Sequence, residues 1–133
     1  MSLFRLILAT AIYVGTLAAG TCVYAQDSTA RTELKRTDLT GTNNMEVISS
    51  IVEFKPGDEV QLHSHHGIES GYVLQGANIQ IPGKDPTTIP TGVPILNLRD
   101  VPHGGYKVIG DTSLKLFTVH VVDKNKPLYE YTK

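Results

Sequence analysis

Three of the five histidines in this chain fall within four consecutive positions, His63, His65 and His66, and Glu69 follows three residues later. Imidazole and carboxylate groups bind divalent transition metals, and two histidines with one carboxylate form a facial set that leaves coordination positions open. In a β-strand, side chains two residues apart point to the same face. His63 and His65 would therefore present two imidazoles to one ion, while His66 would point away.

Two further residues can complete such a site. Gly67 allows the chain to bend back, so Glu69 can supply a carboxylate from the next strand. His103, in "DVPHGG", is distant in sequence, but a barrel could bring it to the same face. Three histidines and one glutamate would leave about two octahedral positions for water or substrate, as in catalytic sites. At this point a solvated Glu69 and a simple loop histidine at His103 remain alternatives.

Groups for proton transfer are harder to assign from the sequence. The candidates are Tyr72, His66 and His120, and strand register alone does not show which of them faces the pocket. His120 alternates with Leu114, Leu116 and other residues of one strand face, which favours a structural or pocket-lining role over metal ligation. We expect His66 to be exposed or to lie just outside the ligand set.

The surrounding pattern indicates the elements that must position these residues. From Met45 onward, short segments rich in β-branched residues alternate with turns containing Gly, Pro, Asn and Asp. Turn signals every 8 to 12 residues are typical of an all-β barrel or sandwich. No amphipathic helix is expected after the leader. We expect a hairpin around Gly76 and the strongest strand at "LKLFTVHVV".

The first 25 residues are typical of a signal peptide. One positive charge at Arg5 precedes a long uncharged apolar run, which ends in small residues at Ala25. A lipoprotein anchor on Cys22 and an uncleaved membrane anchor are alternatives. Each interpretation places the functional domain outside the cytoplasm, in the periplasm or secreted.

Composition restricts the remaining chain further. Cys22 is the only cysteine, so a mature chain starting near Gln26 has no disulfide, zinc-thiolate site or cysteine nucleophile. Removing Arg5 leaves 11 basic against 13 acidic residues, without the clustered basic face that nucleic acid or a membrane surface calls for. We expect a polar N-terminal arm over residues 26–44, with at most one short edge strand, and a single domain over residues 45–133.

The spacing around the histidines resembles the first motif of the cupin superfamily. That motif is glycine, five residues, His-any-His, three or four residues, glutamate, six residues and glycine. Every fixed position is present, and the matching residues are Gly57, His63, His65, Glu69 and Gly76.

The second cupin motif is matched only in part. Gly92 and His103 fit it, whereas Leu98, Asp100 and Lys107 stand where proline, glycine and asparagine are expected. The histidine is thus retained, but the turn before it has changed. Aspartate adopts a left-handed turn less readily than glycine.

The resemblance is to small, exported, single-domain bacterial cupins (type 2). It implies a cupin β-barrel (a double-stranded β-helix or jelly roll), commonly a homodimer, with one divalent transition metal (Fe, Mn, Zn, Ni or Cu). The implied metal ligands are the residues that match the family motifs, His63, His65, Glu69 and His103.

The fold alone does not give a reaction, because cupins include dioxygenases, isomerases, lyases and binding proteins. The first hypothesis is a metalloenzyme acting on a small oxygen-rich substrate, of the dioxygenase, isomerase or lyase type. The alternative is a non-catalytic cupin that binds a sugar or small ligand, or an interaction module.

Overall fold

The computed structural model describes residues 30–132, and these residues form an all-β domain, as predicted. The described part contains no helix, and therefore none able to cross a membrane. The predicted signal peptide lies outside the described residues. The strands are β1 (Arg31–Asp38), β2 (Met45–Phe54), β3 (Glu59–Val60), β4 (His63–Ser64), β5 (Gly67–Gln75), β6 (Ala77–Gln80), β7 (Thr87–Ile89), β8 (Pro94–Asn97), β9 (Tyr106–Ile109), β10 (Leu114–Asp123) and β11 (Glu130–Tyr131).

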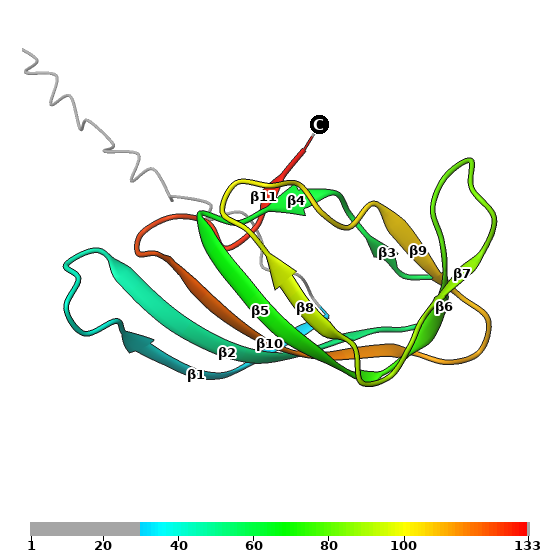
Figure 1. The fold of residues 1–133 in the computed structure, drawn as a ribbon, viewed down its shortest axis with the longest axis horizontal. Helices are drawn as coiled ribbons and strands as arrows, with labels where there is room; N and C mark the ends of the chain where they lie inside the picture. Colours follow the sequence, from blue (N-terminus) through cyan, green and yellow to red (C-terminus); the bar gives the residue numbers. More distant parts are fainter. Residues whose placement is uncertain (1–29, 133) are drawn as a thin grey trace, which may run out of the picture.

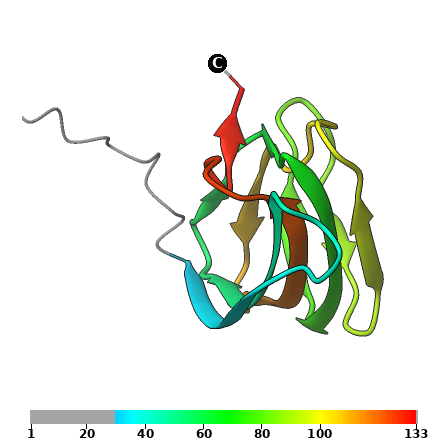
Figure 2. The same cartoon turned by 90° about the vertical axis from the view of Figure 1, so that its left-hand side faces the viewer.

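The strands form two main sheets that enclose a common interior. The larger sheet has the order β1-β2-β10-β5-β8, the smaller one β3-β9-β6-β7, and β4 pairs with β11. In Figure 1, β2 and β10 lie below the interior, and β4, β3 and β9 lie above it. The view turned by 90° shows the strands wrapping around the interior (Figure 2). A cavity between the two sheets is lined by residues of both.

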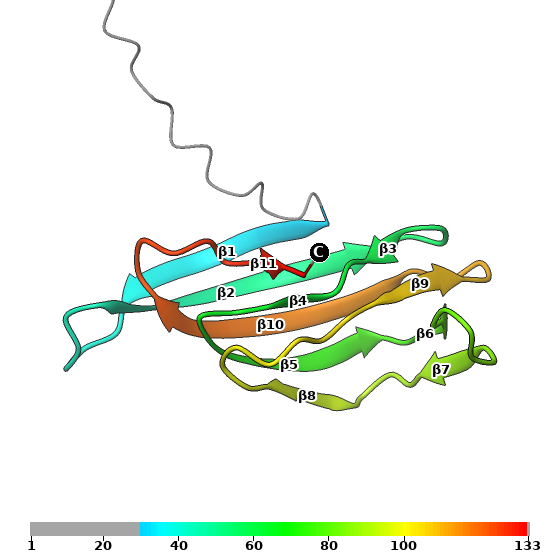
Figure 3. The ribbon, with the colours of Figure 1, turned by 90° about the horizontal axis from the view of Figure 1, so that it is seen from above.

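The N-terminal arm contains a longer strand than the sequence suggested. β1 pairs antiparallel with β2 along the edge of the larger sheet, with a register shift between Glu33 and Lys35. Figure 3 shows β1 beside β2. Edge strands rich in charge resist pairing with other chains. The polar composition of β1 therefore suits a solvent-exposed edge strand rather than an irregular segment.

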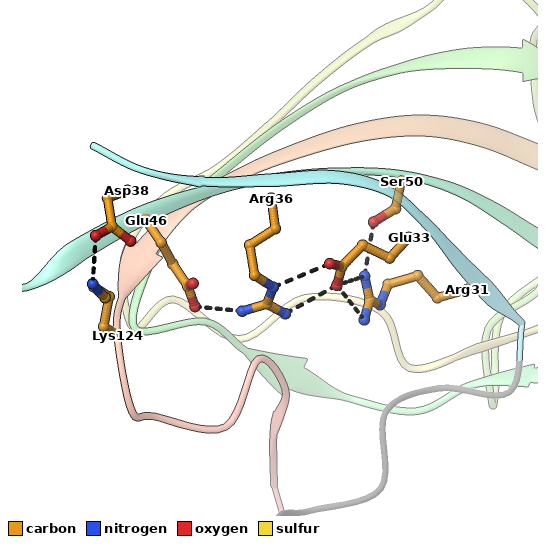
Figure 4. Close-up of polar contacts among 7 residues, drawn as sticks. All are labelled: Arg31, Glu33, Arg36, Asp38, Glu46, Ser50 and Lys124. Atoms are coloured by element: carbon orange, nitrogen blue, oxygen red, sulfur yellow. Dashed lines mark hydrogen bonds and ion pairs between the residues drawn. The ribbon is translucent and has the colours of Figure 1, made fainter. Parts of the chain in front are cut away.

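Charged side chains hold this edge in place (Figure 4). Nη1 of Arg36 lies 2.7 Å from Oε1 of Glu46, and its Nη2 lies 2.9 Å from Oε2 of Glu33. The hydrogen bond from Arg36 holds the pKa of Glu33 below its usual value. Arg31 donates a 2.9 Å hydrogen bond to Oγ of Ser50. Exposed ion pairs each contribute little to the free energy of unfolding. These contacts therefore fix the position of β1 more than they stabilise the fold.

The hairpin predicted around Gly76 is wrong. β5 ends at Gln75 in the larger sheet and β6 begins at Ala77 in the smaller one, and the two strands do not pair. Gly76 is the corner at which the chain changes sheets. A Cβ atom there would collide with the backbone carbonyl of Ile89, so only glycine permits this close approach.

The interior is organised in layers across the larger sheet. Leu116 of β10 lies opposite Val52 and Val73, and these residues belong to the buried apolar core. Four residues further along β10, His120 lies opposite Ile48 of β2 and Glu69 of β5. The inward-facing residues of β10 thus belong to an apolar core at one end of the barrel and to a polar layer at the other.

Candidate metal centre

The structure brings together the four residues that the cupin motifs imply as ligands. His63 lies on β4 and His65 follows that strand directly, while Glu69 enters from β5 in the opposite sheet, as predicted. His103 comes from the loop between β8 and β9. Its backbone pairs with that of His63 through two hydrogen bonds of 2.8 and 3.0 Å. This pairing brings the distant histidine into the cluster.

Three ligand atoms converge on one point. Nε2 of His65 lies 3.3 Å from Oε2 of Glu69, and Nε2 of His103 lies 3.2 Å from the same oxygen. The two imidazole nitrogens are 3.1 Å apart. Metal–nitrogen bonds of about 2.1 Å at right angles would place neighbouring ligand atoms about 3.0 Å apart. The triangle therefore has the size of one face of an octahedral metal site.

Each of the three histidines has its other ring nitrogen fixed by the backbone. A carbonyl oxygen only accepts a hydrogen bond, so each Nδ1 must carry the proton and each Nε2 must be the free ligand atom. The Nδ1 atoms of His63, His65 and His103 contact the carbonyls of Gln61 at 2.7 Å, Leu128 at 2.5 Å and Val101 at 3.1 Å, respectively. Ligand atoms of His63, His65 and His103 all lie within 4.8 Å of one another.

Glu69 is a buried carboxylate, with 8% of its surface exposed. Burial opposes its ionisation, but its contacts with His103 and His65, the nearby His120 and the hydrogen bond from the Asn97 amide hold its pKa well below the usual range. The Asn97 Nδ2 group donates to Oε2 over 2.7 Å. Glu69 is therefore ionised at neutral pH and available as an anionic ligand.

The protonation of two histidines is shifted in opposite directions. Burial lowers the pKa of His63 to about 4, which keeps this imidazole neutral near pH 7. Burial also opposes protonation of His103, but its contact with Glu69 outweighs this effect and raises its pKa. Protons therefore compete with a cation most strongly at His103.

The donor set fits a divalent transition metal. With both Nδ1 atoms protonated, the Nε2 lone pairs of His65 and His103 point at one another and at the charged oxygen of Glu69. The Asn97 amide donates only to the Glu69 oxygen, so the two nitrogen lone pairs repel that oxygen and each other, whereas a cation between the three atoms satisfies all of them. Nitrogen and oxygen donors without sulfur suit the metals that the family resemblance implies.

The remaining sequence candidates lie in different places. Tyr72 is 49% exposed on the outer side of β5 and does not line the cavity, so the structure does not bring this catalytic candidate to the cluster. His66 points away from the cluster, as predicted, and its Nδ1 lies 3.3 Å from Oδ1 of Asp100. His120 is fully buried, and its Nε2 lies 3.5 Å from Oε1 of Glu69.

The altered turn before His103 keeps a left-handed residue. Asp100 has a φ of 58°, the conformation that glycine adopts most easily. Its N–H donates to the carbonyl of His65 over 2.9 Å. The turn therefore has a left-handed residue here although that residue is not glycine, and it is tied to the residue that follows β4.

The sequence did not reveal that the C-terminal segment belongs to the site. The pairing of β11 with β4 places the buried Tyr129 against the histidines, its ring centroid 5.0 Å from that of His63 and 5.2 Å from that of His65. The only sequence signal is the alternation in "YEY", which places Tyr129 and Tyr131 on one face. Asn97 and Tyr106 were missed as well.

A cavity of about 230 Å³ adjoins the cluster. Burial raises the pKa of Tyr106 to about 12 and also raises that of Tyr129, so both phenols stay protonated near pH 7. The cavity is lined by aliphatic and aromatic side chains together with a few polar ones. The polar lining residues are His63, Glu69, Asn97, His103, Tyr106 and Tyr129, and the large apolar ones are Val52, Phe54, Val60, Val73, Ile89, Val93, Ile95 and Leu116.

Known proteins resemble this chain in structure rather than in sequence. No family model and no curated protein matches it. A structure of the DMSP lyases RdDddP and RnDddQII aligns with a TM-score of 0.51 and 14% identity, over 65% of this chain and 44% of that chain. This chain thus spans less than half the length of that lyase chain.

Two further solved structures cover most of the domain. A Thermotoga maritima cupin-like protein aligns with a TM-score of 0.48 and 21% identity, over 77% of this chain and 74% of its own. A Klebsiella pneumoniae protein with a double-stranded β-helix domain aligns with a TM-score of 0.47 and 19% identity, over 83% of this chain and 91% of its own. At these identities the similarity concerns the fold.

Proposed function

We propose that this chain, a cupin-like double-stranded β-helix, is an exported metal-dependent enzyme that acts on a small molecule in its barrel. The observation that carries the proposal is the convergence of two free Nε2 atoms and one buried carboxylate oxygen at 3.1 to 3.3 Å. His63, His65, Glu69 and His103 would hold one divalent transition metal. When bound, the ion would supply Lewis-acid or redox chemistry.

The cavity narrows the class of substrate. Its volume of about 230 Å³ is below the roughly 300 to 1,000 Å³ of pockets for drug-sized ligands. Its wall is mainly apolar, and its polar groups gather where the ligand set lies. We therefore narrow the expected oxygen-rich substrate to a small molecule with an apolar body and one oxygen-bearing end, such as a carbonyl or carboxylate.

The protein groups around the cavity have separate roles. Glu69, ionised and buried, sets the charge of the site. Tyr106 and Tyr129, protonated near pH 7, can donate hydrogen bonds to a substrate oxygen. The apolar walls exclude water from the bound molecule, which strengthens every polar contact inside. These roles are compatible with a dioxygenase, isomerase or lyase reaction.

Export and self-association complete the proposal. The leader over residues 1–25 supports a periplasmic or secreted location. A homodimer is supported by apolar side chains exposed on the outer side of β5 and β8, because such patches mark interaction surfaces. These side chains are Ile68, Tyr72, Leu74 and Leu96. Analytical ultracentrifugation of the wild type and of Leu96→Glu measures the oligomeric state. The wild type should be a dimer and the variant a monomer, and a monomeric wild type would exclude the homodimer.

The decisive experiment measures metal and turnover together. The purified protein is expected to carry about one transition-metal ion per chain, and His63→Ala with His65→Ala should remove it. His66→Ala is the matched control, because His66 neighbours the ligands but points away. Full metal retention in the double variant would refute the metal site.

Screens for oxygen uptake, isomerisation and elimination on the metal-loaded protein then separate an enzyme from a binding protein. Saturable turnover that is lost in Glu69→Gln supports the enzyme. Binding of a sugar or another small ligand without turnover supports the non-catalytic alternative.

A further inference from the structure

His120 is a buried imidazole whose hydrogen-bonding capacity is unused. Its exposed fraction is 0%, and neither ring nitrogen has a hydrogen-bond partner within the described chain. Buried polar atoms in native proteins nearly always have partners, so such an orphan calls for an explanation. Its ring lies 4.6 Å from that of His65, centroid to centroid, and its strand places it opposite Glu69.

The two oxygens of Glu69 face different groups. Oε2 faces the ligand nitrogens of His65 and His103 and accepts the hydrogen bond of Asn97. Oε1 faces His120, whose Nε2 lies 3.5 Å away. This separation exceeds an ordinary hydrogen bond by about 0.6 Å. A small shift of either side chain would close it.

The tautomer of His120 follows from its surroundings. A proton on Nδ1 would leave a buried N–H donor without an acceptor, which is rarer than an unused acceptor. A proton on Nε2 would instead point to the charged Oε1 of Glu69. The three ligand histidines carry their proton on Nδ1, because backbone carbonyls accept from it. His120 has no such carbonyl partner.

We propose that His120 is a positioning residue that donates from Nε2–H to Oε1 of Glu69 and so leaves Oε2 as the single metal-binding oxygen. The inference rests on the proposed metal function. Partners that hold a ligating group in orientation typically change metal affinity 10- to 100-fold when they are removed. His120 would thus set the geometry of the centre without binding the ion.

The test in the metal-free protein uses imidazole nitrogen resonances. Long-range proton–nitrogen correlation spectra of the wild type should show His120 with its proton on Nε2 and the three ligand histidines with theirs on Nδ1. A proton on Nδ1 of His120 would overturn the inference. This measurement is independent of metal binding, so it separates the role of His120 from the proposed function.

The second test measures the dissociation constant of Co²⁺ in two variants. His120→Leu removes the donor at similar volume, whereas His120→Gln keeps an N–H donor of similar reach. We expect the dissociation constant to rise 10- to 100-fold in His120→Leu and to stay within about threefold in His120→Gln. Thr118→Val is the matched control, because Thr118 is buried on the same face of β10, and its hydroxyl also lacks a partner among the described residues.

The outcomes remain distinguishable. Unchanged Co²⁺ affinity and an unchanged Co²⁺ absorption spectrum in His120→Leu would overturn the inference while leaving the metal site intact. Direct coordination of Co²⁺ by His120, visible in its nitrogen resonances, would also overturn it. A wild type that binds no Co²⁺ would refute the proposed function, and the tautomer of His120 would still decide its link to Glu69. If His120→Leu does not fold, the tautomer of His120 measured in the wild type decides whether the inference holds.

Discussion

The metal-free protein should lose stability on mild acidification because two of its buried histidines resist protonation. Burial lowers the pKa values of His63 and His120 to about 4, from 6.5 in the unfolded chain. Between these values the unfolded state binds protons that the folded state does not. Their contribution to stability is therefore complete above pH 6.5 and is lost as the pH falls toward 4.

The size of the loss follows from the same pKa values. At pH 5 each of the two histidines should cost about 2 kcal/mol of unfolding free energy relative to pH 8, and at pH 4 about 3 kcal/mol. His103 acts in the opposite direction, because its pKa is raised and its protonation favours the folded state as the pH falls. The total is thus smaller than the sum for His63 and His120, and a difference between variants is the sharper measurement.

The assay is urea unfolding in the presence of a chelator at several pH values, followed by far-ultraviolet circular dichroism. Replacing His120 with leucine should make the loss between pH 8 and pH 5 about 2 kcal/mol smaller than in the wild type. Thr118→Val, which removes no titrating group from the same face, should keep the wild-type slope. Parallel curves for the wild type and His120→Leu would refute the assignment of a depressed pKa to His120.

Three further predictions concern the backbone around the site and the pH dependence of metal binding. Gly67→Ala should cost about 3 kcal/mol or more in urea unfolding, because the added Cβ would collide with a backbone carbonyl of β10, whereas Gly83→Ala, with a φ of 73° and open space, should cost about 1 to 2 kcal/mol. Equal costs would contradict this difference. Bound metal should be released below about pH 5 to 6, as protons displace it first at His103, and metal content after dialysis at each pH measures this; constant occupancy would count against these ligands. Deleting residues 127–133 should raise the metal dissociation constant 10- to 100-fold, because the carbonyl that fixes His65 is lost; an unchanged constant in titration calorimetry would show that this contact is dispensable.

Local spacing made much of the site predictable. The strand period alone separates His63 and His65 from His66, and the structure keeps this separation. The placement of Glu69 on the following strand was predictable from the glycine before it, although the structure uses Gly67 for close packing against β10. His103 was a candidate from its residue type, but only the family resemblance implied it as a ligand, because the backbone pairing that brings it to His63 is invisible in a linear sequence.

The parts that escaped prediction depend on contacts between distant segments. His120 belongs to a strand whose buried face was evident, but its neighbour across the sheet is fixed by register, and the sequence does not encode register locally. Tyr129 contacts the site only because β11 returns to pair with β4. Gly76 was mistaken for a hairpin turn because a corner between sheets and a turn within one both require glycine.

The layers of the larger sheet also indicate how a substrate would lie. Between the apolar layer at Leu116 and the polar layer at His120 lies a layer of small residues, where Thr118 is opposite Ser50 on one side and Gly71 on the other. The cavity is lined by Leu116 of the apolar layer and by Glu69 of the polar layer. A bound molecule would therefore place its apolar body toward the core and its oxygen-bearing end at the ligand set. The opposite orientation would bury an oxygen among aliphatic side chains without a hydrogen-bond partner, at a cost of about 1 to 3 kcal/mol.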